Sequence, residues 1–338
     1  MFTRPEDVTD EQIRAELAAS WSFAAETLSY LPVGFGCHHW RATDAAGRQL
    51  FLIVHDLSTL LHSRLDTARA AFGRLEAAFG CALSLRRDAK LEFVIAPIPT
   101  GSGQVVRRLS ERYSLAACPY LTDYEPGHDG DFHAADRPAV MRLLTDLHRA
   151  SPVVAPPRCD FELQNVDGLQ TAIENIGEPW HTGPYGERAH ALLARHAAGV
   201  TALIAAYGEL AAKARSRPER CVVTHGEPGA WNVLKTPAGF VVVDWDTVQL
   251  APPERDLWDL AEGDRSALTA YTQATGTAID ADALALFRMW YDLAEIACYI
   301  DLFRGAHDDS EDAAESWKNL EEFLQPAARW PQLRLPAP

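Results

Sequence analysis

The segment that decides the fold spans residues 221–259 and reads CVVTHGEPGAWNVLKTPAGFVVVDWDTVQLAPPERDLWD. It begins with a β-branched run at residues 222–224, which leads into a loop at residues 225–231 that is too rich in Gly and Pro for a helix or a strand. Residues 240–243 are almost wholly apolar, as in a strand buried on both faces. Residues 236–239 read as the turn of a hairpin that joins the two strands.

Acidic and amide side chains gather around this hairpin. Asp244 and Asp246 follow the apolar run at alternate positions, so that both carboxylates project to the same side if the extended conformation persists. Glu227 and Asn232 lie on the preceding loop, and the hairpin is expected to bring them to the same end as Asp244. Hard oxygen ligands of this kind suit Mg²⁺, which takes one or two protein carboxylates together with substrate phosphates. The segment therefore predicts a magnesium site.

The order of these motifs resembles a known family. The pattern HGExxxxN at residues 225–232, followed by VDWD at residues 243–246 and PPERDLWDL at residues 252–260, is similar to the catalytic and metal-binding segments of the aminoglycoside phosphotransferase and choline kinase-like family, which includes spectinomycin phosphotransferases. The resemblance implies the α+β, two-lobed fold of protein kinases, with a small antiparallel-sheet N-lobe and a larger, mostly helical C-lobe. It covers most of the chain in the order of elements.

The resemblance also implies roles for individual residues. Glu227 takes the place of the catalytic base, which accepts the proton of the substrate hydroxyl in kinase-type phosphoryl transfer. The family usually has Asp at this position, and the alternative interpretation of Glu227 is a solvated loop carboxylate. The remaining roles are loop ordering at the catalytic site for His225, Mg²⁺ binding for Asn232 and Asp244, a further metal-binding or orienting role for Asp246, and a structural role for Asp256, which is expected to accept backbone hydrogen bonds.

Two segments are expected to bind the nucleotide, ATP or GTP. Gly34 and Gly36 bracket Phe35 in a hairpin turn, and glycine allows backbone amides to approach phosphates closely. By itself the GFG turn is also compatible with an ordinary hairpin. Pro119, Tyr120 and Leu121 lie where a kinase-like chain crosses between its lobes, and backbone groups there can bind an adenine edge.

The family's small-lobe lysine is missing. The strand at residues 51–54 aligns with the lysine-bearing strand, but Ile53 or its neighbour stands at the expected position. His55 follows, and its unperturbed pKa of about 6.5 makes it only partly charged at neutral pH. Possible substitutes along the chain are Lys90, Arg107 and Arg108. Because the lysine is absent, a nucleotide-binding protein without phosphoryl transfer stays open as an alternative.

Helical spacing predicts several helices. A first helix follows the capping residue Thr9, and others are expected at residues 65–79, 137–149, 190–215 and through much of residues 267–324. Glu76 in the second of these is either the acid that pairs with the missing lysine or a surface acid. His148 ends the third and is expected to be a packing histidine. Two further strands are expected at residues 91–98 and 104–109, and another at residues 114–121.

Composition bounds the remaining possibilities. With 338 residues, of which 47% are hydrophobic, the chain is long enough for two lobes, which we place at residues 1–122 for nucleotide binding and 123–338 for catalysis and substrate binding. The net charge of −16 argues against binding nucleic acid and favours a small cationic partner, although acidity also serves solubility.

The cysteines and the apolar segments give no sign of export. The six cysteines show neither CxxC pairs nor a disulfide framework. The N-terminal segment lacks an apolar signal region, and no run of eighteen apolar residues occurs. We therefore expect a cytoplasmic protein that does not contact a membrane, as a monomer or a homodimer.

The C-terminal helices complete the prediction. In the family they wall the substrate site, and the candidates for binding cationic groups are Asp292, Glu295, Tyr299 and Asp301. The predicted function is an ATP- or GTP-dependent phosphotransferase that acts on a hydroxyl of an aminoglycoside- or aminocyclitol-type antibiotic and so confers resistance. A small-metabolite kinase of choline, sugar or nucleoside type is the alternative.

Overall fold

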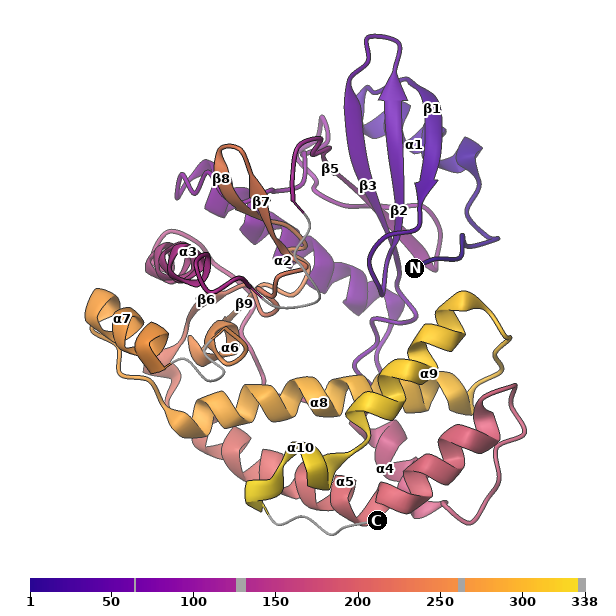
Figure 1. Cartoon of the computed structure of the whole chain (residues 1–338). Helices are drawn as coiled ribbons and strands as arrows, with labels where there is room; N and C mark the ends of the chain where they lie inside the picture. Colours follow the sequence, from indigo (N-terminus) through magenta and orange to yellow (C-terminus); the bar gives the residue numbers. More distant parts are fainter. Residues whose placement is uncertain (64, 126–131, 261–264, 334–338) are drawn as a thin grey trace. The chain divides into compact units, whose positions relative to one another are not determined.

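The computed structural model describes residues 1–63, 65–125, 132–260 and 265–333, which form a mixed α+β structure (Figure 1). The chain divides into two compact units. The first comprises Met1–Leu60, Ala68–Cys159 and Arg217–Leu284, and the second comprises Leu61–Thr67, Asp160–Ser216 and Ala285–Pro338. This division follows packing rather than chain order, and the lobe boundary between residues 122 and 123 stays a prediction.

A five-stranded antiparallel sheet forms the N-terminal part of the first unit, in the order β1-β2-β3-β5-β4. The bounds of its strands are β1 Ala25–Leu31, β2 His38–Asp44, β3 Gln49–Asp56, β4 Arg107–Arg108 and β5 Tyr113–Pro119. The register places His39 opposite Ile53 and Leu52 opposite Ala117. Because side chains alternate along a strand, Leu52 and Val54 face one side of the sheet and Ile53 and His55 face the other.

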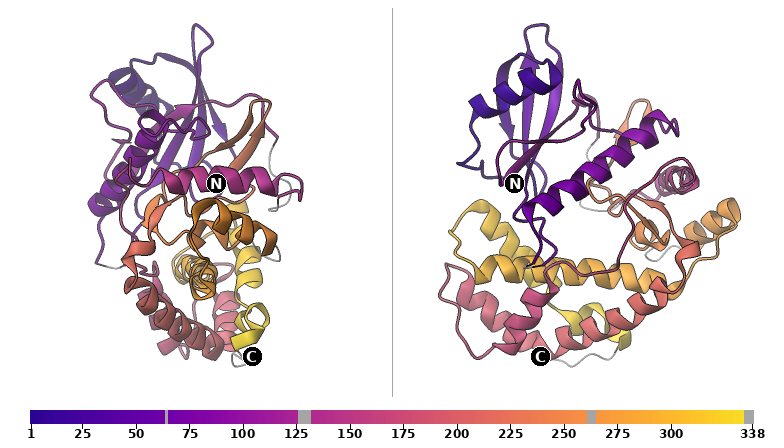
Figure 2. Two further views of the ribbon diagram at one scale, coloured as in Figure 1. Left: turned by 90° about the vertical axis from the view of Figure 1, so that its left-hand side faces the viewer. Right: turned by 180° about the vertical axis from the view of Figure 1, so that it is seen from behind.

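Helix α1, Asp10–Trp21, covers the first of these faces (Figure 2). Thr9 begins it with a capping box, in which the Thr9 side chain accepts from Gln12 N and the Gln12 side chain accepts from Thr9 N. The fully buried Ile13 and Leu17 pack into one cluster with residues from β2, β3 and β5. The predicted first helix and its cap are confirmed.

Helix α2, Ala68–Arg87, lies next to the second face of the sheet, where the rings of His55 and Phe79 are 5.6 Å apart. It begins and ends later than the predicted helix at residues 65–79. Glu76 is exposed on it, in keeping with a surface acid.

The two strands expected at residues 91–98 and 104–109 are mostly wrong. Only β4 forms there, and Val94 makes a single bridge to Val242. The backbone groups of this segment bond to two different partners, since Ile95 N donates to Val242 O at 2.9 Å and Ile98 N donates to Ala117 O at 2.7 Å. The apolar residues thus belong to a connection between two strand pairs.

The segment at residues 221–259 forms two short strand pairs in the first unit. Strands β7, Val233–Thr236, and β8, Gly239–Val242, form a hairpin around the predicted turn at residues 236–239, although no strand was predicted at residues 233–236. Strand β6, Val222–Thr224, pairs instead with β9, Gln249–Ala251, so the expectation that the hairpin joins it to the second strand is wrong. The helices of this part are α3 Arg137–Arg149, α6 Glu254–Leu257, α7 Arg265–Thr275 and the 3-10 turn η1 Pro218–Arg220.

The described secondary-structure elements of the second unit are all helices or 3-10 turns. Its elements are α4 Val166–Glu174, α5 Gly186–Arg215, α8 Ala281–Arg304, whose first turn belongs to the first unit, α9 Glu311–Phe323, α10 Pro326–Arg329 and the 3-10 turn η2 Pro331–Leu333. Helix α5 packs against α4, α9 and α10. Within the described part of the chain, α5 is also long and apolar enough to pass a length-and-composition test for a membrane span, a test that core helices of soluble proteins pass as well.

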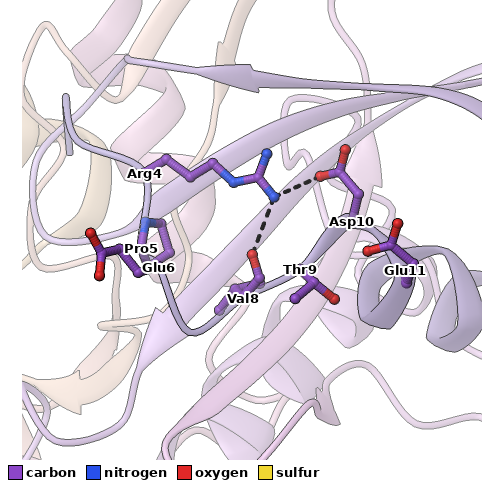
Figure 3. Close-up of a pocket in the computed structure, with 7 residues that line it drawn as sticks. All are labelled: Arg4, Pro5, Glu6, Val8, Thr9, Asp10 and Glu11. Carbon is purple, nitrogen blue, oxygen red and sulfur yellow. Dashed lines mark hydrogen bonds and ion pairs between the residues drawn. The ribbon is translucent and has the colours of Figure 1, made fainter.

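A pocket lies at the segment that precedes α1 (Figure 3). Arg4 reaches across it, and its guanidinium donates to Asp10 Oδ1 at 2.8 Å and to Val8 O at 3.2 Å. None of the predicted site residues lines this pocket.

Candidate active site

The loop between β6 and β7 is held in place by His225, which is fully buried. Its Nδ1 accepts from Glu227 N at 3.2 Å, and its Nε2 donates to Val243 O at 2.9 Å. We assign this neutral tautomer from the hydrogen bonds. Burial lowers the pKa of His225, which agrees with a neutral ring. His225 therefore orders the loop that carries Glu227.

Asp256 on α6 holds the same loop through hydrogen bonds to its backbone. Its Oδ1 accepts from Gly226 N at 2.6 Å, and its Oδ2 accepts from His225 N at 2.8 Å. Nε2 of His148, on α3, lies 3.1 Å from the same Oδ2. Burial would raise the pKa of Asp256, but the hydrogen bond from His148 and nearby positive charge outweigh it and lower the pKa. The carboxylate is thus held ionised.

Gly226 is required by the conformation of this loop. Its φ is 108°, and a Cβ at this position would overlap the guanidinium of Arg255. Arg255 is buried and donates to Thr224 Oγ1 and to Thr247 O, each at 3.0 Å. The glycine thus lets the loop at residues 225–231 lie directly on the buried guanidinium of Arg255.

Asn232 ties the end of the loop to the strand that carries the acids. Its Nδ2 donates to Glu227 O at 3.0 Å, and its backbone O accepts from Val243 N at 2.9 Å. Because the amide nitrogen is the donor, Oδ1 is the atom that can accept or ligate. The loop residue Glu227, Asn232 and the start of the acidic segment are therefore adjacent, although the hairpin expected to bring them together pairs other strands.

Asp244 departs from the expected extended conformation, since its φ is 63°, in the left-handed region. Between the two acids, Trp245 is buried and its Nε1 donates to Val242 O at 2.9 Å. Asp244 keeps an exposed surface, yet the protein packed around it raises its pKa, first by desolvation and then through the charges of Asp246 and Glu227. The three carboxylates therefore share one electrostatic site even though the alternation argument fails.

Asp246, unlike Asp244, lies next to a basic side chain that can offset its negative charge. Its Oδ2 lies 3.6 Å from Nε2 of His55 on β3. Burial alone would raise the pKa of Asp246, but the neighbouring His55 outweighs it and lowers the pKa. His55 thus faces the acids from the same side of β3 as Ile53, the position at which the small-lobe lysine was expected.

The donor set fits a magnesium ion. Asn232 offers an amide oxygen, Asp244 and Asp246 offer carboxylates, and mutual repulsion raises the proton affinity of Asp244. A divalent cation relieves repulsion of this kind and prefers these ligand atoms. The three residues are therefore a chemically suitable Mg²⁺ site.

The cationic substitutes considered for the missing lysine have partners elsewhere. Arg107 Nε donates to Glu16 Oε1 at 2.8 Å, and Arg108 donates to Ala68 O at 2.7 Å. Lys90 is exposed. In the described residues, the basic side chain that faces Asp246 from the sheet is thus His55.

The glycine turn between β1 and β2 has the conformation that its residues predict. Gly34 and Gly36 have φ values of 70° and 87°, and Phe35 between them is 43% exposed. His39 Nδ1 donates to Val33 O at 2.8 Å, and burial lowers the pKa of His39 to about 4. The neutral His39 therefore braces one end of the turn.

The segment expected at the lobe crossing follows directly on β5, whose last residue is Pro119. The guanidinium carbon of Arg41 lies over the ring of Tyr120, 5.8 Å from the ring centroid, in a cation–π contact. Pro119 is exposed, and Tyr120 and Leu121 are half-buried. Nucleotide binding by this segment and by the glycine turn stays a prediction.

The four substrate candidates lie in the second unit, on α8. Asp292 is buried and accepts from Arg329 and from Trp330 Nε1, at 2.7 to 2.9 Å. Tyr299 donates to Glu295 Oε2 at 2.6 Å. Asp301 is exposed. Asp292, Glu295 and Tyr299 thus have partners within their own unit, and Asp301 presents its carboxylate to solvent.

Comparison with known proteins gives a family and a fold. The model of the phosphotransferase enzyme family matches residues 104–290. Protein StrN of Streptomyces griseus is 29% identical over 284 residues, which cover 77% of this chain and 80% of StrN.

Two solved structures resemble the whole chain. Spectinomycin phosphotransferase APH(9)-Ia, in complex with ADP and spectinomycin, has a TM-score of 0.72 at 16% identity and is matched over 97% of this chain and 100% of its own. A microcompartment-associated aminopropanol kinase has a TM-score of 0.61 at 16% identity, with 97% and 99% coverage. These likenesses confirm the predicted kinase-like α+β fold.

Proposed function

The chain belongs to the phosphotransferase enzyme family, and we therefore propose that it transfers the γ-phosphoryl group of ATP or GTP to a hydroxyl of an aminoglycoside- or aminocyclitol-type antibiotic. The observation that carries this proposal is the site shared by Glu227, Asn232, Asp244 and Asp246, in which a loop carboxylate lies beside a set of oxygen ligands. This is the combination of a base and a metal site that phosphoryl transfer to an alcohol needs.

Each residue has a distinct task in the proposed reaction. Glu227 accepts the proton of the substrate hydroxyl, and His225 fixes the loop through Glu227 N. Asn232 and Asp244 hold Mg²⁺, and Asp246 assists them. When bound, Mg²⁺ neutralises charge on the nucleotide phosphates. Asp256 keeps the loop in register by accepting from two consecutive backbone amides.

Three further segments carry the remaining proposed contacts. The glycine turn at residues 34–36 offers backbone amides to the nucleotide, and residues 119–121 border the adenine. Asp301 and Glu295 on α8 are proposed to bind cationic groups of the substrate, with Tyr299 placing the Glu295 carboxylate and Asp292 holding the helix through Arg329.

The net charge of the chain and its structural similarity to solved kinases support the proposed substrate class. The net charge of −16 favours a cationic substrate, because a negative field raises its local concentration. The spectinomycin phosphotransferase likeness points to aminocyclitols. The aminopropanol kinase likeness supports a second candidate, a kinase of small amino alcohols such as choline.

The test is consumption of ATP and of GTP, with Mg²⁺, against aminoglycosides, aminocyclitols, choline and short amino alcohols, with product masses measured in parallel. A gain of one phosphoryl group on an antibiotic supports the proposal, and a gain on an amino alcohol alone replaces it with the second candidate. Absence of product on every compound contradicts both.

A matched pair of variants separates chemistry from binding. Glu227→Gln keeps the size of the side chain and removes the base, so kcat is expected to fall by about 10²-fold or more with little change in nucleotide affinity. Asp301→Asn alters a proposed substrate contact and is expected to raise KM more than it lowers kcat. The reverse pattern would contradict these assignments.

A further inference from the structure

Cys37, His55 and Asp246, three potential metal ligands of different chemical type, lie close together in the first unit. The Sγ of Cys37, a ring nitrogen of His55 and a carboxylate oxygen of Asp246 all lie within 4.8 Å of one another. Cys37 ends the glycine turn before β2, His55 lies on β3, and Asp246 follows β8. Three segments far apart in the sequence therefore bring one sulfur, one nitrogen and one oxygen together.

Among the three residues, the environment of His55 is the one that indicates a missing ligand. It is 0% exposed, and among the described residues neither Nδ1 nor Nε2 has a hydrogen-bond partner. The nearest acid, Asp246 Oδ2, is 3.6 Å from Nε2, which is an ion-pair distance but too long for a hydrogen bond. Buried polar groups are nearly always paired, and one that is not indicates a functional role or a missing ion.

The charges around Cys37 also favour a cation. The carboxylate of Asp246 lies within 4.8 Å of the Cys37 sulfur, and the charge of Asp244 acts on it as well. A metal binds the thiolate form of cysteine, and the thiol proton is released to solvent. The same acids that oppose a bare thiolate attract a divalent ion.

The ligand chemistry selects the metal. Zinc binds cysteine sulfur, histidine nitrogen and carboxylate oxygen, and sites with three protein ligands keep a fourth position open. Magnesium binds oxygen and does not favour sulfur. A cluster with one ligand of each type is thus matched to zinc and is distinct from the oxygen set of Asn232 and Asp244.

We propose that Cys37, His55 and Asp246 form a zinc-binding site, and that zinc bound there inhibits phosphoryl transfer. Asp246 is shared between this site and the proposed magnesium site, so zinc withdraws it from its assisting role. Zinc also ties the glycine turn, through Cys37, to the strand that carries His55. The inhibition rests on the proposed function, whereas the binding does not.

Cobalt(II) tests the binding without substrate or turnover. Metal-free protein titrated with Co²⁺ is expected to bind one equivalent and to develop a thiolate-to-cobalt absorption band, which zinc then abolishes by displacement. Cys37→Ser should remove the band and weaken zinc binding about tenfold or more, and His55→Gln should weaken it similarly. Cys298→Ser, an exposed cysteine on α8, is the matched control and should behave as the wild type.

A band that survives in Cys37→Ser, or a wild type that develops no band, overturns the site. The inhibition has its own test, in which zinc is titrated into the phosphotransfer assay at saturating magnesium and nucleotide. Wild type and Cys298→Ser are expected to lose activity at the zinc concentration that fills the site, while Cys37→Ser keeps it until about tenfold more zinc is present. Equal sensitivity of the three proteins overturns the inhibition and leaves the spectroscopic result to decide the binding.

Discussion

Nε2 of His148 lies 3.1 Å from Oδ2 of Asp256, and this carboxylate also receives the backbone amides of His225 and Gly226. His148 and Asp256 are both buried, and Nδ1 of His148 faces the hydroxyl of Tyr271 at 2.7 Å. A chain of polar contacts thus runs from α7 through α3 and α6 to the loop that carries Glu227. The geometry of the candidate site depends on helices that contribute none of its proposed reacting groups.

Asp256→Ala is expected to destabilise the protein by about 3–5 kcal/mol, because it leaves a buried histidine and two buried amides without their acceptor. Asp256→Asn retains one acceptor oxygen and is expected to lose less. Urea unfolding at neutral pH measures both values. A loss below about 1 kcal/mol for Asp256→Ala would show that the loop is held by other contacts.

His39 predicts a pH dependence of stability. Its pKa in the folded protein is about 4, below its unfolded value of about 6.5, so the unfolded chain binds more protons between these values. The contribution of neutral His39 is complete above pH 6.5 and is lost as the pH falls toward 4. Unfolding free energies measured across this window should therefore decline more steeply for the wild type than for His39→Gln, which keeps a donor but does not titrate. Parallel curves would contradict this assignment.

Asp244→Asn is expected to abolish turnover without destabilising the protein. Desolvation and the charges of Asp246 and Glu227 raise the pKa of Asp244, so removing its charge relieves repulsion in the metal-free protein. Thermal unfolding should give a midpoint equal to or above that of the wild type, and added Mg²⁺ with nucleotide should raise the wild-type midpoint more than that of the variant. Asp308→Asn removes a charge from an exposed loop and should leave activity unchanged. A variant that still turns over would remove Asp244 from the proposed metal site.

Local patterns in the sequence predicted the parts of the fold that depend on local physics. The capping box at Thr9 and the turn at residues 236–239 follow from residues a few positions apart. The grouping of Glu227, Asn232 and Asp244 followed from the family pattern, because the hairpin that was expected to bring them together does not form between the predicted strands.

Long-range pairing could not be predicted in this way. Strand β6 has three residues, too few to specify a partner, and it pairs with β9 some twenty-five residues away. Asp244 adopts the left-handed conformation next to the buried Trp245, and this breaks the alternation that the sequence suggested. The meeting of His55 with Cys37 depends on the register of β2 and β3 and on the position of Asp246, and no local spacing reports it.

Gly226→Ala and Gly208→Ala provide a pair in which the same chemical change has opposite effects. At Gly226 the φ of 108° is unfavourable for alanine, and the new Cβ would overlap the buried guanidinium of Arg255, so we expect a loss of about 2 kcal/mol or more together with a large fall in activity. At Gly208, in the helix α5, a Cβ meets no atom within 4 Å, and alanine is expected to add up to about 1 kcal/mol. Urea unfolding of both variants measures the difference. If Gly226→Ala were as stable as Gly208→Ala, the close contact between the loop at residues 225–231 and Arg255 would be wrong, and the anchoring of Glu227 would have to come from His225 and Asp256 alone.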